Sequence, residues 1–165
     1  MGATPRLSLS FLSPGQAQKE FTVNEALQTL DTVVAPAVEE GPRSDPPASP
    51  SLGSCYIVGT SPTGEWAGKA QFLATFTSGG WRLISPPEGT SVYVKDGGIW
   101  AAYRGGSWEL GSLRASRVLI GNEQVVGARG AAIGSASGGA TVDSEARSVI
   151  DAILAALRLH GLIEP

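Results

Sequence analysis

The spacing of apolar residues near the C-terminus places the strongest constraint on how this chain can fold. Intervals of four, three, four and three residues separate Ala146, Ile150, Ile153, Leu157 and His160. This spacing is typical of the a/d seam of a coiled coil and places all five residues on one face of a helix. The helix has only about five turns at ~3.6 residues per turn, which is too short for stability alone in water. We therefore expect it to pack against other elements or against other copies of the chain.

Sequence signals mark both ends of this helix. Thr141 or Asp143 can accept hydrogen bonds from the first free backbone N–H groups. At the other end, Gly161 can adopt the left-handed conformation of a Schellman cap, with Leu162 folding back onto Leu157. The helix is therefore predicted to begin just after its cap residue and to end before Gly161.

The width of the apolar face bears on the number of partners. Leu154, Leu159 and Ile163 extend the face beyond a strict a/d stripe. This extension favours a trimeric bundle, or packing against a β layer, over a two-stranded zipper. An ordinary amphipathic helix on its own domain is the alternative. His160 is the only histidine, and at the helix end we expect it to make a cap or an intersubunit contact rather than to do acid–base chemistry.

Composition bounds the class of protein. A chain of 165 residues fits one domain or two small modules. Its net charge of −3, without a basic stripe, argues against nucleic acid as the primary partner. Charged residues make up 16% of the chain, below the roughly 25% of average proteins, while 22 glycines and 11 prolines indicate turn-rich β structure.

Cysteine content and hydropathy indicate the compartment. Cys55 is the one cysteine, so an intrachain disulfide is excluded, and its apolar neighbours predict a buried thiol in a reducing cytoplasm. The N-terminus does not read as a secretion signal, and no apolar run approaches the ~18 residues of a membrane span. We expect a protein made in the bacterial cytoplasm, with no membrane insertion.

Residues 1–40 are predicted to form an N-terminal helical anchor. The sequence Thr22-Val23-Asn24-Glu25 reads as a capping box, with Phe21 as a hydrophobic staple. Residues 14–20 are predicted to form a separate turn, or one helical turn that meets this helix at an angle, and Pro36 disfavours continuation of the helix. The apolar residues after the capping box keep helical spacing: Val23, Ala26, Leu27, Leu30, Val33 and Val34.

The rest of the chain is predicted to contain a linker, a β module and a C-terminal segment. Residues 41–54 carry four prolines and read as a linker. Residues 55–112 form a small antiparallel meander joined by glycine-containing turns. Its expected strands are 55–58, 70–76, 81–84, 91–94, 99–103 and 107–110.

Residues 113–165 combine a hairpin with the oligomerisation helix. Strands 117–120 and 123–126 meet at Gly121-Asn122, a two-residue hairpin signal. Because residues 125–127 do not alternate, part of the hairpin should be covered on both faces. The expected fold is thus mainly β with terminal helices, assembled in a homotrimeric bundle.

Each tryptophan closely follows a glycine, which places a large ring just after a turn. Such rings can stack on the apolar face of a sugar, although a core position is the more common role of tryptophan in a small module. Trp66 and Trp108, with Tyr93 and Tyr103 beside them, are the residues that we expect to contact carbohydrate.

Neither a catalytic set nor a metal or cofactor site is predicted. The single histidine has no nearby nucleophile, and the glycine-rich runs lack the Lys-Ser/Thr of a P-loop. Asp143 and Glu145 read as helix-end residues that complement the dipole. We therefore expect a protein that is not an enzyme.

Several motifs together resemble an uncharacterised domain of alphaproteobacterial prophage and gene-transfer-agent fibre and spike proteins. The resemblance to this domain lies in segments 15–20, 24–27, 56–59, 64–68 and 80–82, and the tail segments 124–129, 141–147 and 157–163 look like the terminus of phage fibre proteins. It implies a virion structural protein, either a head spike or a tail fibre, that attaches to host surface polysaccharide. It also implies that the N-terminal segment binds the capsid or another virion protein.

Two alternatives remain open. The first is a stand-alone carbohydrate-binding module. The second is a glycan-degrading enzyme, which is less favoured because Glu65, Glu88 and Asp96 lie on predicted turns of a module too small for a cleft with two opposed carboxylates.

Overall fold

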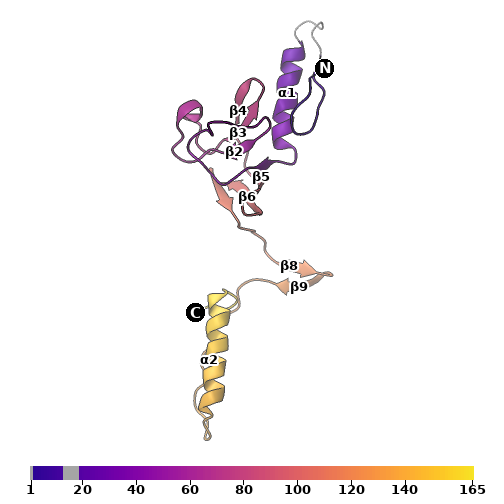
Figure 1. Cartoon of the computed structure of the whole chain (residues 1–165). Coiled ribbons are helices and arrows are strands. Elements are labelled where there is room, and N and C mark those ends of the chain that lie inside the picture. Colours follow the sequence, from indigo (N-terminus) through magenta and orange to yellow (C-terminus); the bar gives the residue numbers. More distant parts are fainter. Residues whose placement is uncertain (1, 13–18) are drawn as a thin grey trace. The chain divides into compact units, whose positions relative to one another are not determined.

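A computed structural model describes residues 2–12 and 19–165, and it divides the chain into two compact units (Figure 1). Unit 1 spans Met1–Ser112 and unit 2 spans Leu113–Pro165. Unit 1 holds the predicted segments 1–40, 41–54 and 55–112 together. The turn predicted for residues 14–20 falls largely on residues 14–18, which lie outside the described residues.

Unit 1 contains two small sheets rather than the single meander that the sequence predicts. The first is a three-stranded antiparallel sheet in the order β2 (Cys55–Ile57), β3 (Leu73–Thr77), β4 (Gly80–Ile84). The second has the order β1 (Ala37–Val38), β5 (Ser91–Val94), β6 (Ile99–Arg104), β7 (Ser107–Leu110). Its edge strand β1 pairs parallel with β5, which the sequence does not predict. The meander is interrupted at Pro86-Pro87, where two residues without a backbone N–H cannot extend the ladder.

The strands expected between residues 55 and 110 are all present, with one clear shift. β3 begins at Leu73 rather than at residue 70. Gln71 has a positive φ of 68°, and such a backbone conformation belongs to a turn rather than to a strand.

The main core lies between the two sheets and takes side chains from both. Its buried members are Val38, Cys55, Ile57, Leu73, Val92, Val94, Ala101 and Trp108. In β5, Val92 and Val94 face this core while Ser91 and Tyr93 face outward, the period of two expected of a half-buried strand. The predicted burial of Cys55 is confirmed.

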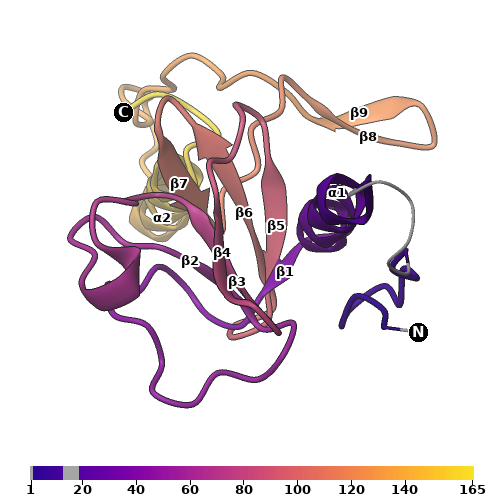
Figure 2. The ribbon, with the colours of Figure 1, turned by 90° about the horizontal axis from the view of Figure 1, so that it is seen from above.

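Helix α1 (Lys19–Val33) begins before the predicted capping box, so that prediction is wrong. Thr22 lies within the helix, and the Asn24 side chain bonds the backbone of Leu12 instead. Phe21 is 70% exposed and does not form the expected staple. The capping box fails because the helix already runs through Thr22, and Glu25 pairs with Arg82 rather than reaching back to a cap. Figure 2 shows α1 at one flank of the strands of unit 1.

The polar side of α1 faces unit 1, whereas its apolar stripe faces solvent. Asp31 is 1% exposed and accepts hydrogen bonds from the Thr4 hydroxyl and from the backbone N–H groups of Arg6 and Leu7. Glu25 pairs with Arg82 of β4 at 2.5 Å. The exposed apolar residues on this helix and just after it include Val23, Leu30, Val33 and Val34.

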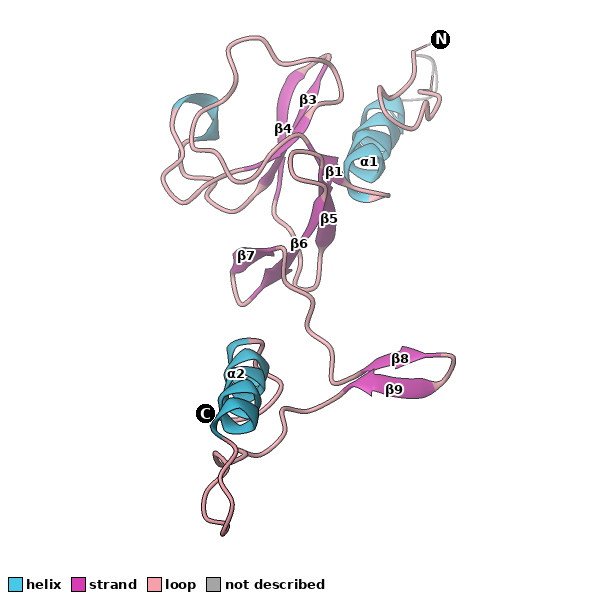
Figure 3. Cartoon of the chain, turned by 60° about the horizontal axis from the view of Figure 1, so that its bottom comes forward, coloured by secondary structure: helices cyan, strands magenta, loops and turns pink. Residues whose placement is uncertain are grey.

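Unit 2 comprises a hairpin and one long helix (Figure 3). Strands β8 (Val118–Ile120) and β9 (Glu123–Val126) pair antiparallel as predicted, and Gly121 and Asn122 both have positive φ. All seven strand residues are exposed in the single chain. The expectation that part of this hairpin is covered on both faces is therefore not met within one chain.

Helix α2 (Ser144–Leu159) has both predicted caps. The Asp143 carboxylate accepts a hydrogen bond from the Ala146 N–H at 2.9 Å. At the other end the Leu162 N–H donates to the Leu157 carbonyl at 2.9 Å, and Gly161 has a φ of 71°. These are the contacts of a Schellman motif. Within the described chain, no helix combines the length and apolar character that a membrane span requires.

Candidate functional site

The four predicted sugar-contacting residues do not form one site. Trp66 is fully buried and Trp108 is 8% exposed, so the expectation that these two rings are displayed is wrong. Trp66 lies in the short helix η1 (Gly64–Trp66) and packs edge-on against Trp81, with 4.9 Å between ring centroids. Tyr103 packs against Trp108, 5.4 Å between centroids. In so small a module these large rings serve as core.

Trp108 is further fixed by hydrogen bonds to one residue. Its indole N–H donates to the Gln71 carbonyl at 2.9 Å, and its backbone N–H donates to the Gln71 side chain at 3.2 Å. These bonds satisfy the polar end of a buried ring, as is usual for a buried tryptophan. The Trp108 ring thus holds β7 to the turn before β3 and cannot stack on a ligand in this conformation.

Tyr93 is the predicted residue that faces solvent, and its neighbour is Trp100. The two are directly opposite on β5 and β6, with ring centroids 5.6 Å apart and planes at 68°. Trp100 is 61% exposed and Tyr93 is 37% exposed. We call these two residues the aromatic pair.

Sequence reasoning missed Trp100, although a signal for it is present. The apolar residues Val92 and Val94 predict that Tyr93 faces outward. A four-residue turn over residues 95–98 then pairs Val94 with Ile99 and Tyr93 with Trp100. Residues directly opposite in a ladder share one face of the sheet, so the register alone assigns Trp100 to the outer face.

The aromatic pair exposes ring surface on a face of the sheet that also carries charged side chains. Arg104 and Glu109 lie on the same face of the sheet as Trp100, by register, and form an ion pair at 3.2 Å. An exposed ring beside hydrogen-bonding side chains is the combination that recognises a sugar, whose C–H face stacks and whose hydroxyls bond. The aromatic pair is therefore an exposed ring surface on the same face of the sheet as a polar ion pair.

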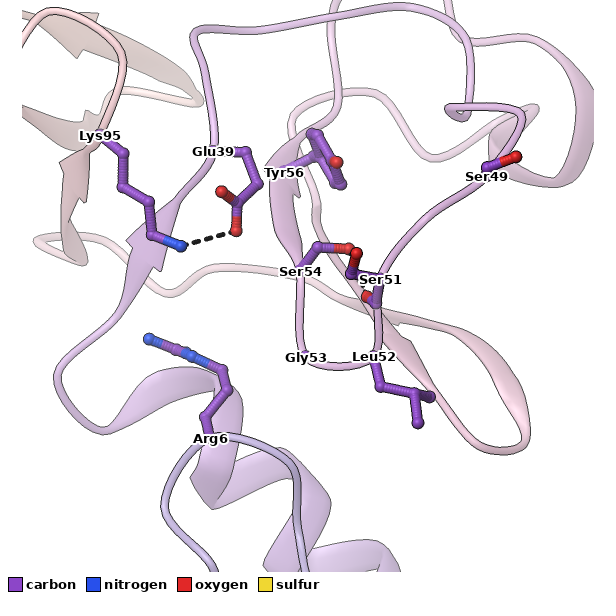
Figure 4. A pocket seen from close by; sticks show the side chains of 9 residues that line it. All are labelled: Arg6, Glu39, Ser49, Ser51, Leu52, Gly53, Ser54, Tyr56 and Lys95. Atoms are coloured by element: carbon purple, nitrogen blue, oxygen red, sulfur yellow. Dashed lines mark hydrogen bonds and ion pairs between the residues drawn. The ribbon is translucent and has the colours of Figure 1, made fainter.

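A polar cavity of about 400 Å³ lies at the ends of β1 and β5 (Figure 4). Glu39 follows β1 and Lys95 follows β5, and their side chains form an ion pair at 2.7 Å. Lys95 is two residues from Tyr93 of the aromatic pair. The cavity is lined by Arg6, Glu39, Ser49, Ser51, Leu52, Gly53, Ser54, Tyr56 and Lys95.

The predicted oligomerisation residues lie along an exposed face of α2. Ile150 is 42% exposed and Ile153 is 54% exposed, while Leu157 is half-buried. Ala146 and His160, at the two ends of the stripe, are exposed as well.

An adjacent face of α2 contacts its own chain. Leu154, which the sequence assigns to the wider apolar face, is 5% exposed. Arg147 donates to the backbone carbonyl of Gly138, and Arg158 donates to that of Ile133. Leu154 is therefore already covered, whereas Ile150, Ile153 and also Leu159 of the wider face remain exposed.

Two findings concern metal binding and the reactivity of the cysteine. In the described ranges there is no group of three or more His, Cys, Asp or Glu side chains that could hold a metal ion. Burial raises the pKa of the Cys55 thiol, which disfavours the nucleophilic thiolate.

Comparison with known proteins identifies the family but no activity. The model of a family described as "Protein of unknown function (DUF2793)" matches residues 23–109. This match covers more than half of the chain and runs from α1 through β7, so the chain belongs to that family. No curated protein matches the chain.

Proposed function

We propose that this member of the DUF2793 family is a virion structural protein without enzymatic activity, a head spike or tail fibre of a phage or gene transfer agent. It assembles as a homotrimer and attaches the particle to polysaccharide on the host surface. The observation that carries the proposal is the apolar stripe of α2, which the single chain leaves in solvent.

Unit 2 buries too little apolar surface to be stable by itself. In the described chain, Leu154 and Ile163 are its only buried apolar side chains, among 53 residues. Its hairpin exposes Ile120 at 68% and Val125 at 53%. A segment of this size without a core, disulfide or metal gains its stability from association.

The partner that best matches the stripe is another copy of the same helix. Each copy carries the same a/d spacing, so in a symmetric assembly the a and d side chains of one helix insert between the matching side chains of the next. Isoleucine at both adjacent seam positions, Ile150 and Ile153, shifts the preference from two strands towards three. Val149, 60% exposed beside the seam, widens the face in the way that a trimer requires.

Helix α1 supplies the proposed contact with the rest of the particle. Its polar side is occupied by unit 1 through Asp31 and Glu25, whereas Val23 and Leu30 remain exposed on the other side. An apolar stripe on an otherwise bonded helix marks a protein-interaction surface. We assign the capsid or another virion protein as its partner.

The aromatic pair supplies the proposed contact with polysaccharide. One aromatic pair per chain binds a sugar weakly. In a trimer three such sites are linked, so after one site binds a repeating glycan the other two meet it at high effective concentration. Trimerisation would therefore raise the avidity of the particle for glycan. The virion assignment draws on the resemblance of the sequence motifs to prophage and gene-transfer-agent proteins.

Particles provide the test of this function. Mass spectrometry of purified phage or gene-transfer-agent particles from the producing strain is expected to detect the chain. The purified chain should compete with particles for adsorption to host cells, and the Trp100→Ala variant should compete less well. Particles that lack the chain, yet adsorb normally, would rule the proposal out.

A second candidate function is a carbohydrate-binding module that acts outside any virion. The aromatic pair favours it, because both rings belong to unit 1 and need no second copy. Glycan binding by a chain that is never recovered with particles would favour this alternative.

A further inference from the structure

Tyr56 presents an unused hydroxyl to the cavity of Figure 4. The residue is 9% exposed, and its ring is held against Trp66 and Trp81 at centroid distances of 5.9 Å. The Arg43 guanidinium lies over the same ring at 5.7 Å. Yet within the described residues this phenolic hydroxyl has no hydrogen-bond partner. The hydroxyl borders the cavity, so it can donate to and accept from a ligand or solvent there.

Other hydroxyls around the cavity are also available. Ser49 and Ser51 line it, and no protein group in the described ranges hydrogen-bonds to either side chain. The Ser54 hydroxyl instead donates to the Ser51 carbonyl at 2.7 Å. Each free hydroxyl can both donate and accept a hydrogen bond. A ligand with several hydroxyls of its own matches this lining.

The charged residues of the cavity are already balanced. Lys95 pairs with Glu39 at 2.7 Å. The Arg6 guanidinium donates to the carbonyls of Asp31, Thr32 and Ala35 at 3.0, 3.1 and 3.0 Å. These carbonyls lie at or just beyond the C-terminal end of α1, where the helix carries partial negative charge. The cavity therefore holds no uncompensated cation for an acidic group.

We infer that this cavity is a subsite for an uncharged sugar residue, a second contact beside the aromatic pair for the same glycan. Its volume of about 400 Å³ lies within the range of ~300–1,000 Å³ found for small-molecule sites. Tyr56, Ser49 and Ser51 bond the sugar hydroxyls, and the Glu39–Lys95 pair offers both an acceptor and a donor. The inference rests on the proposed glycan attachment and names the chemical class of the glycan.

Saturation-transfer NMR on the full-length chain tests the subsite. The probes are glucose, galactose, mannose and rhamnose at millimolar concentration, with glucuronate as the acidic comparison. At least one neutral sugar is expected to bind. Its affinity should not depend on salt, because an uncharged sugar forms no ion pair with the cavity that salt could screen. Tyr56→Phe is expected to weaken it about 2- to 12-fold, the worth of one neutral hydrogen bond. Its melting temperature should not fall, since the hydroxyl makes no bond within the described protein.

A matched pair of serine variants separates the cavity from general effects. Ser51→Ala removes a hydroxyl that lines the cavity, and Ser148→Ala removes an exposed hydroxyl on α2. Only the first should weaken sugar binding. The inference is overturned if no probe binds, if only glucuronate binds and salt weakens it, or if Tyr56→Phe binds as the unmodified chain does. If particle attachment still depends on Trp100 while Tyr56→Phe leaves sugar binding unchanged, the subsite is refuted and the proposed function stands.

Discussion

Replacing Trp66 or Trp100 with alanine separates a tryptophan of the core from one of the surface. Both residues follow a glycine-containing turn, and the sequence pattern treats them alike. In the structure Trp66 is 0% exposed and contacts Tyr56 and Trp81, whereas Trp100 is 61% exposed and contacts Tyr93. The two substitutions should therefore affect different properties of the protein.

The expected losses of stability follow from burial. A fully buried tryptophan replaced by alanine costs about 3–5 kcal/mol in unfolding free energy, so Trp66→Ala should remove much of the 5–15 kcal/mol typical of a domain. Less than half of Trp100 is protected from solvent, which scales the same cost to about 1–2 kcal/mol. Trp100→Ala should instead abolish most glycan binding.

Urea unfolding followed by far-UV circular dichroism measures the difference, because this signal comes mainly from the backbone and reports unfolding in both variants. Both variants and the unmodified chain are compared at one protein concentration, since the stability of an oligomer depends on concentration. Trp66→Ala should unfold at clearly lower urea than Trp100→Ala. Equal losses of stability, or normal glycan binding by a folded Trp100→Ala variant, would refute the assignment of these two rings.

Three further predictions concern α2 and the core thiol. Ile153→Asp should convert the assembly to monomers in size-exclusion chromatography with light scattering, while the exposed, off-seam control Ala155→Asp should not; equal behaviour would argue against the seam. Gly161→Ala should lower the unfolding free energy by about 1–2 kcal/mol, because the position has positive φ although its surroundings have room for a methyl group; an unchanged melting temperature would contradict the Schellman cap. Cys55 should react slowly with iodoacetamide at pH 8 in the folded chain and rapidly in urea, because burial raises the pKa of its thiol; fast alkylation of native protein would place Cys55 outside the core.

Elements set by local sequence could be predicted well. Glycine turns fix the start of β4 and the ends of β6, and the caps of α2 depend on Asp143 and Gly161, which act within a few residues of themselves. The mainly β content and the two terminal helices follow from such signals. The alternation in β5 predicts which of its residues face the core.

Features that depend on distant partners could not be predicted. Helix α1 begins at Lys19, before the predicted cap, and its place in unit 1 depends on bonds from Asn24 and Asp31 to residues 12 and up to 27 positions away in sequence. Trp66 is buried because η1 folds over β2, β3 and β4, a packing that no local pattern encodes. The parallel pairing of β1 with β5 joins residues more than fifty positions apart. The aromatic pair could be found only from the hairpin register.

The mass of the assembled chain in solution tests most directly whether copies join through α2. Size-exclusion chromatography with light scattering at low micromolar concentration should give three times the chain mass of 16.9 kDa, and Ile153→Asp should reduce it to that of one chain. A single-chain mass for the unmodified protein, with its α2 stripe still exposed, would contradict self-association and the spike or fibre assignment that depends on it.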